Sequence, residues 1–193
     1  ESVTDFGSPE EMAGSANRDL AVSLLQRVVE SPQQLTGESI VSSVTAATNL
    51  VAATELTGGL SADSTNTSTA LESVLSSLSN SLGQGAVAGE DPTTAGTRPE
   101  QAGPVRINMA AQVLGEASAA ALPLADATVE FPPVNTSLGA RLSAVAVRGS
   151  PVYPVSNGTT GTAQSGGLVS IQLLGATGEV IPVRGADPPI RFT

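Results

Sequence analysis

The chain of 193 residues contains no cysteine, histidine or tryptophan, and its eight basic residues are all arginine. Without thiol or imidazole groups, it lacks the common nucleophiles, general bases and zinc ligands of enzymes. A serine nucleophile would have neither histidine nor lysine to remove its proton. We therefore predict a protein that is not an enzyme and that uses no cofactor or metal ion.

Aromatic residues make up 2% of the chain and hydrophobic residues 40%, so the core is expected to consist of alanine, valine, leucine and isoleucine. The formal net charge of −10 disfavours binding to nucleic acid or to an anionic membrane. No apolar run reaches the length of about 18 residues that spans a bilayer. Glu1 is not followed by a signal-peptide pattern. We expect a fragment of a larger protein that does not itself insert into a membrane.

The first part of the chain repeats its apolar residues at helical spacing. A first helix is expected to start at Ser8-Pro9-Glu10-Glu11, where Ser8 can cap the helix and Glu11 can complete a capping box. We expect this helix to end at Ser31-Pro32. Its predicted core-facing stripe is Ala16, Leu20, Leu24 and Val28, widened by Leu25 and Val29.

Two further helices are predicted before Gly83. Thr36 is the expected cap of the second helix, and Gly58-Gly59 is its expected end. Its predicted buried face comprises Ile40, Val44, Ala47 and Val51. The third helix is predicted from Leu71, Val74, Leu75, Leu78 and Leu82. Its serines are expected on a solvated face and include Ser73, Ser76, Ser77 and Ser79.

After Pro104 the apolar residues alternate, which is the period of a β-strand. Strands are expected within residues 105–109, 127–131, 142–147 and 169–173. The turns between them are predicted at Pro132-Pro133, Gly149-Ser150-Pro151, Asn157-Gly158 and Gly166-Gly167. Residues 84–103 have no periodicity and are rich in glycine, proline and threonine, so they are interpreted as a linker or an ordered loop.

The C-terminal residues predict a hairpin and a last strand. The turn Gly175-Ala176-Thr177-Gly178 is expected to lead into a short strand, Val180-Ile181-Pro182-Val183, whose proline indicates an edge or a bulge. In the last strand, Ile190 and Phe192 alternate with Arg191, so its apolar face must be covered by another segment. An isolated fragment is therefore expected to be incompletely stable.

Helices first and strands second indicate an α+β fold. We predict an N-terminal helical subdomain at residues 1–83, a linker at 84–103, and an antiparallel β-sandwich at 104–193.

Three Asn-x-Ser/Thr triplets are candidate N-glycosylation sites, at Asn66, Asn135 and Asn157. Each lies where the pattern predicts a loop or the start of a helix, so a glycan acceptor there would be exposed. In a chain rich in serine and threonine such triplets also arise by chance, and Asn157-Gly158 is equally typical of a plain turn.

The acidic residues do not form a pattern of catalytic or metal-binding groups. Glu10-Glu11 is explained by the charge preference of a helix N-terminus, and Glu90-Asp91 by solvation in the linker. The remaining acids are too dispersed for a calcium site, namely Asp126, Glu130, Glu179 and Asp187. The glycine pairs also lack the lysine of a phosphate-binding loop.

The C-terminal segment resembles the closing β-subdomain of GAIN domains, which occur in polycystin-1-like proteins and adhesion receptors. In that family a strand, a glycine turn, an Ile-Pro-Val strand and a Pro-Ile-x-Phe strand lead into the proteolysis motif. The matching residues are Leu173, Gly178, Glu179, Ile181, Pro182, Val183, Pro189, Ile190 and Phe192. The family's order of a helical subdomain followed by a β-sandwich also agrees with the pattern of this chain. The His-Leu-Ser/Thr cleavage tripeptide of the family is absent.

The resemblance implies a non-enzymatic structural or adhesive module on the extracellular side of the plasma membrane. For a polycystin-1-like protein it implies a ciliary or flagellar surface. The implied partners are the rest of the parent ectodomain, a polycystin-2-type channel, or the filaments called mastigonemes. Two alternatives remain open: the GAIN domain of a signalling adhesion receptor, and a secreted structural glycoprotein of a cell wall or appendage.

Overall fold

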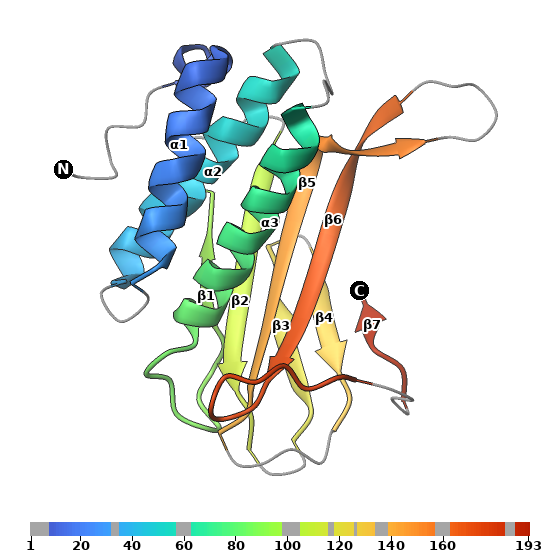
Figure 1. Ribbon diagram of the computed structural model, residues 1–193. Coiled ribbons are helices and arrows are strands. Elements are labelled where there is room, and N and C mark those ends of the chain that lie inside the picture. Colours follow the sequence, from blue (N-terminus) through green and yellow to red (C-terminus); the bar gives the residue numbers. More distant parts are fainter. Residues whose placement is uncertain are drawn as a thin grey trace. The chain divides into compact units, whose positions relative to one another are not determined.

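A computed structural model (Figure 1) describes residues 8–31, 35–56, 63–97, 105–115, 118–125, 127–133, 139–156, 163–183 and 188–193. Its helices are α1 (Ser15–Val29), α2 (Gly37–Leu56) and α3 (Asp63–Leu82), and a 3₁₀ turn, η2 (Glu11–Ala13), precedes α1. The strands that follow are β1 (Thr93–Gly96), β2 (Arg106–Val113), β3 (Ala120–Pro123), β4 (Thr128–Phe131), β5 (Arg141–Ser156), β6 (Ala163–Leu174) and β7 (Arg191–Phe192). Helices followed by strands make this an α+β fold, as the sequence predicted.

The strands form two antiparallel sheets. One has the order β1-β2-β5-β6, and the other has the order β3-β4-β7. Since β7 is the last strand of the chain and pairs with β4, residues 175–190 carry the chain from the first sheet to the second.

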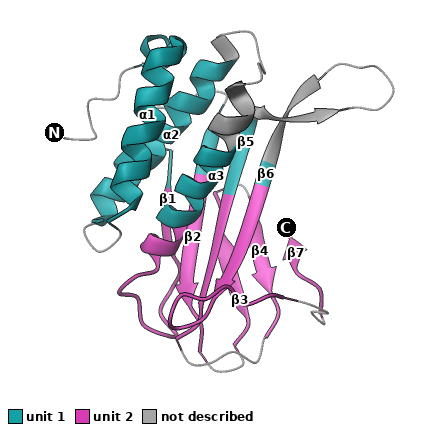
Figure 2. Ribbon diagram, viewed as in Figure 1, with its two compact units in different colours: residues 1–78, 96–107, 146–168 teal, residues 79–95, 108–145, 169–193 magenta. Residues whose placement is uncertain are grey.

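The chain divides into two compact units (Figure 2). Unit 1 comprises residues 1–78, 96–107 and 146–168, and unit 2 comprises residues 79–95, 108–145 and 169–193. The elements α3, β1, β2, β5 and β6 each continue from one unit into the other. The division at residues 83 and 103 stays a prediction.

In unit 1, α2 is the helix with the least exposure to solvent. None of its residues from Ser39 to Thr54 is exposed. The predicted face of Ile40, Val44, Ala47 and Val51 is buried, with at most 2% exposure. The predicted cap is also confirmed, because the Ser39 N–H donates to the Thr36 hydroxyl at 3.2 Å. The expected glycine end of α2 lies outside the described residues.

Two predictions for the first helix are wrong. The α-helix begins at Ser15 after the 3₁₀ turn η2, although the Ser8 N–H does donate to the Glu11 carboxylate at 3.0 Å. Ala21 and Leu25 face the core of unit 1, whereas Leu20 is 59% exposed. Because an α-helix turns about 100° per residue, positions four apart advance by about 40°, so the predicted stripe does not stay on one face. Ala16 and Leu20 are exposed, and Leu24 and Val28 are half-buried.

Helix α3 has the predicted apolar residues in the core. Leu71, Val74, Leu75, Leu78 and Leu82 are all buried. The prediction of a solvated serine face holds for Ser73, which is exposed, but not for Ser79, which is 2% exposed. Ser81 is buried as well, so small hydroxyl side chains contribute to the packed surface of this helix.

The strand predictions are confirmed at their centres and wrong at several boundaries. Strand β1 lies within the expected linker, and β3 was not predicted. β5 continues through Gly149-Ser150-Pro151, and β6 continues through Gly166-Gly167. Gly149 has a φ of 65°, a conformation that glycine adopts easily, so this cluster bends the strand instead of ending it.

The segment 180–183 is not a strand in the structure. It makes one isolated bridge, between Leu174 and Val180, which includes the hydrogen bond from the Ile181 N–H to the Leu173 carbonyl at 2.8 Å. The pairing stops before Pro182, which has no N–H to donate. The preceding turn is as predicted: the Gly178 N–H donates to the Gly175 carbonyl at 3.0 Å, and Gly178 has a φ of 94°.

Candidate functional site

Of the three candidate glycosylation sites, one lies within the described residues and two lie outside them. Asn66 lies in the first turns of α3, and its side chain is not among those described. Asn135 and Asn157 lie outside the described residues. Glycosylation of these asparagines therefore stays a prediction.

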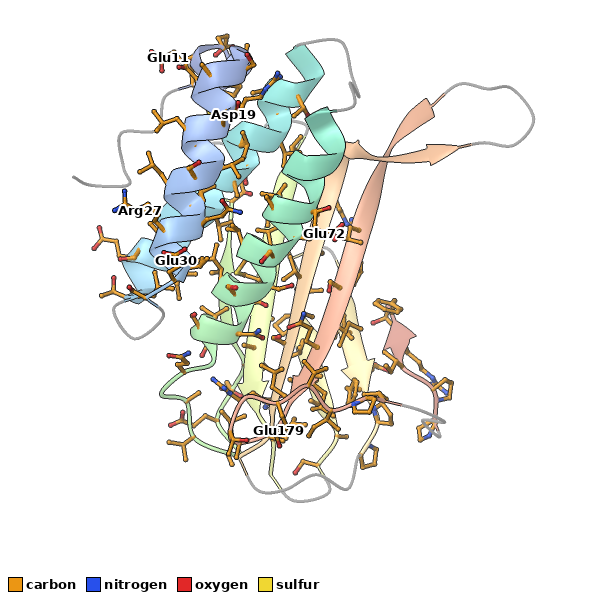
Figure 3. The ribbon with its side chains drawn as sticks, viewed as in Figure 1. Glu11, Asp19, Arg27, Glu30, Glu72 and Glu179 are labelled. Carbon is orange, nitrogen blue, oxygen red and sulfur yellow. The ribbon has the colours of Figure 1, made fainter. Side chains whose placement is uncertain are left out.

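Four of the acids labelled in Figure 3 lie on different segments of the chain. Glu11 is in η2, Asp19 is in α1, Glu72 is in α3, and Glu179 follows the C-terminal turn. No cluster of three or more potential metal ligands occurs among the residues that the structure describes.

Several carboxylates bind backbone N–H groups close to them in sequence. Glu11 accepts from Ser8, and Glu90 accepts from the Val87 N–H at 2.9 Å. Glu10 accepts hydrogen bonds from its own backbone N–H and from Ser8, and these bonds hold the pKa of Glu10 below its usual value. These acids cap turns and helix starts, where an ionised carboxylate is favoured.

Glu179 closes the turn that follows β6. Its carboxylate accepts a hydrogen bond from the Thr177 hydroxyl, and its carbonyl accepts the Gly175 N–H at 2.8 Å. The Thr177 hydroxyl, and then the backbone, hold the pKa of Glu179 below its usual value. A side chain at Gly175 would collide with this carboxylate, so the glycine allows Glu179 to fold over the turn. This acid thus stabilises local structure.

A chain of neutral polar side chains joins α3 to β5 and β6 within unit 2. The Ser143 hydroxyl donates to the side-chain oxygen Oδ1 of Asn80 at 3.1 Å. The side-chain amide of Asn80 donates to the side-chain oxygen Oε1 of Gln172 at 3.2 Å. Ser79 lies 3.5 Å from Ser143, and both serines are buried. Asn80 and Gln172 are half-buried. A polar network of this kind fixes which residues of a helix meet which residues of a sheet.

A second neutral network lies in unit 1 and joins α2 to Thr97, which follows β1, and to Ile107 in β2. The hydroxyls of Thr48 and Thr97 are 2.9 Å apart, and Thr48 also donates to the Val44 carbonyl at 2.8 Å. The Ile107 N–H donates to the Thr97 hydroxyl at 2.9 Å. With the Thr97 hydroxyl as the donor to the Thr48 oxygen, each of the two hydroxyl protons makes one hydrogen bond. This network has no ionisable member.

The edge of the three-stranded sheet carries an exposed aromatic side chain in unit 2. Phe192 in β7 pairs with Val129 in β4, and Arg191 pairs with Glu130. Phe192 is 56% exposed, although Val129 is completely buried. The sequence predicted an apolar face for this last strand, and the structure leaves that face partly open to solvent.

No family model, curated protein or solved structure matches this chain. None of the described helices is long and apolar enough to cross a bilayer.

Proposed function

We propose that this chain is a non-enzymatic structural and adhesive module in the extracellular part of a large polycystin-1-like surface protein. The observation that carries the proposal is that the polar side chains joining its helices to its strands are neutral, and that they are buried or half-buried. Ser79, Asn80, Ser143 and Gln172 bond one another, and Thr48 bonds Thr97. The carboxylates of Glu11 and Glu90 accept from backbone N–H groups of local turns, and that of Glu179 accepts from the Thr177 hydroxyl. Polar groups that bond one another or cap turns hold the fold together, as expected of a structural module.

The order of the elements supports the same proposal. Three helices precede two antiparallel sheets, which is the order that the GAIN resemblance implies. In such a protein the module would hold neighbouring ectodomain segments in a fixed geometry near the membrane. As partners we propose the rest of the parent ectodomain and a polycystin-2-type channel, on a ciliary or flagellar surface that can carry mastigonemes.

Labelling of intact cells from the native source tests the extracellular location. An antibody raised against residues 1–193 should bind cells that have not been permeabilised, and a membrane-impermeant biotin reagent should label the antigen. Glycosidase treatment should lower its mass, because secreted domains expose asparagines such as Asn66, Asn135 and Asn157 to the transferase.

The outcomes separate the proposal from its rivals. Staining that requires permeabilisation would contradict an extracellular location. Extraction of the antigen by salt without detergent would favour a secreted wall or appendage glycoprotein over a membrane protein. A seven-span segment after Thr193 in the parent protein would favour an adhesion receptor, and a lipid-binding sandwich with more spans would favour a polycystin.

A further inference from the structure

An exposed Asp-Pro bond lies in the connection between α3 and β1. The turn before it ends at Glu90, whose N–H donates to the Val87 carbonyl at 3.2 Å, and β1 begins at Thr93, directly after Pro92. Asp91 is exposed, Pro92 is half-buried, and neither residue belongs to a helix or a strand. The bond that joins them therefore runs through a solvent-accessible loop, where a chain is most readily cut.

The Asp91 carboxylate is not engaged by the fold. No residue that the structure describes makes a hydrogen bond or an ion pair with it. The neighbouring Glu90 differs, because its carboxylate accepts from the Val87 N–H at 2.9 Å and its carbonyl accepts from the Gln112 side-chain amide at 2.9 Å. The loop is thus held before Asp91 and again at β1, while the Asp91 side chain can turn onto its own carbonyl carbon.

This position combines a nucleophile with a peptide bond that breaks readily in acid. A carboxylate oxygen of Asp91 attacks the main-chain carbonyl carbon of the same residue and closes a cyclic anhydride, an intramolecular step. The electron pair of the broken C–N bond goes to the Pro92 nitrogen, which takes a proton from the acidic solvent and leaves as an amine. Because this nitrogen belongs to a tertiary amide, it accepts a proton more readily than an N–H amide does. Water then opens the anhydride, returns a proton to the solvent, and leaves Asp91 with a main-chain and a side-chain carboxyl group.

The fold places many contacts across this bond. Each compact unit contains residues from both sides of it, so the two cores stay assembled when the bond is cut. Side-chain hydrogen bonds cross it as well, and the bonded pairs are Thr48 with Thr97, Asn80 with Ser143, and Asn80 with Gln172. None of these contacts uses the Asp91–Pro92 bond, so buried apolar area and hydrogen bonds should hold the two pieces together.

We propose that the Asp91–Pro92 bond is an acid-dependent self-cleavage site, and that residues 1–91 and 92–193 stay bound to each other after it is cut. The product carries its helices on one fragment and its strands on the other. The proposal concerns a bond inside the chain and needs no particular location, so it can hold or fail separately from the proposed function.

Intact mass spectrometry of residues 1–193 follows the reaction in a mildly acidic buffer in which circular dichroism shows the native fold. We expect one fragment that ends at Asp91 and one that begins at Pro92, with little cleavage at neutral pH. Asp91→Asn removes the carboxylate, and we expect it to cleave at least about tenfold more slowly, a barrier higher by about 1.4 kcal/mol. Pro92→Ala keeps the carboxylate but restores an N–H amide, so it should also be slower. Cleavage at Asp187-Pro188, the other such pair in the chain, would give fragments of different mass.

Size-exclusion chromatography under native conditions tests the association. We expect the cleaved protein to elute with the intact chain and to separate into two fragments in urea. Equal cleavage rates for Asp91→Asn and the unsubstituted chain would overturn the proposal. Cleavage that occurs only in acid with added urea would also overturn it, because the folded loop would then not permit the attack. Separate elution of the fragments without denaturant would contradict the second half of the proposal, since the contacts that cross the cut would not hold them together.

Discussion

Ala125, in the connection between β3 and β4, has a backbone conformation that is unfavourable for a residue with a Cβ atom. Its φ is 58°, the one positive value among the described residues other than glycine. The neighbouring backbone is held by the hydrogen bond from the Leu124 N–H to the Ala127 carbonyl at 2.7 Å. The left-handed conformation costs an L-residue about 1–2 kcal/mol.

We therefore predict that Ala125→Gly stabilises the protein. The relief of strain, about 1–2 kcal/mol, is offset by the extra unfolded-state entropy of glycine, about 0.4–1 kcal/mol, so the gain is expected to be about 0–1.6 kcal/mol. Urea unfolding followed by circular dichroism measures it. The matched control is Ala121→Gly at an exposed position of β3, which should lose about 0.5–1 kcal/mol. Equal destabilisation by both substitutions would contradict the prediction.

At the scale of elements, the threonine network of unit 1 gives an asymmetric prediction. Thr97→Val leaves the buried Ile107 N–H without its acceptor, which costs about 1–3 kcal/mol. Thr48→Val is milder, about 0–1 kcal/mol, because the Thr97 hydroxyl can still donate to the Ile107 carbonyl 3.2 Å away. Urea unfolding should rank the two valine variants in this order.

Thr97→Ser is the control for this network, because it keeps the hydroxyl and loses only a methyl group. Its unfolding free energy should lie closer to that of the unsubstituted chain than to that of Thr97→Val. A larger loss in Thr48→Val than in Thr97→Val would show that the Ile107 N–H does not depend on Thr97.

Elements dominated by apolar periodicity were predictable from the sequence, and those that depend on long-range pairing were not. The spacing of Ile40 and Val44 in α2, and of Leu71 and Leu78 in α3, predicts that these residues share a face, and all four are buried. Helix α1 has apolar residues on more than one side, so the choice of Ala21 and Leu25 over Leu20 depends on what packs against it. No local signal determines that choice.

The strand boundaries and the polar networks also depend on long-range pairing, so the local sequence did not predict them. Gly149 and Pro151 carry turn signals, but β5 continues through them as a strand of the sheet in which β2 and β6 are its neighbours. The pairing of Thr48 with Thr97 joins residues 49 positions apart, and that of Asn80 with Gln172 joins residues 92 apart. The apolar face of the last strand was predicted from Ile190 and Phe192, whereas its register against β4 required the structure.

At the scale of the whole molecule, the boundary between the compact units runs through continuous elements. In β5, residues 141–145 belong to unit 2 and residues 146–156 to unit 1, and β6 is divided at residue 168. Helix α3 crosses the boundary after Leu78. Opening one unit alone would interrupt a helix and several strands in their middle, with loss of their hydrogen bonds.

We therefore predict that both units unfold in one cooperative transition. Native-state hydrogen exchange in rising denaturant should give the amides of α2 and those of Leu142–Val145 the same limiting free energy. A substitution should also act on both units. Thr97→Val in unit 1 should lower the exchange free energy of unit 2 amides by the amount measured in unit 1, and Ala125→Gly in unit 2 should raise it in α2. If Thr97→Val leaves unit 2 protection unchanged, the units open independently, and continuity of α3, β5 and β6 does not couple them.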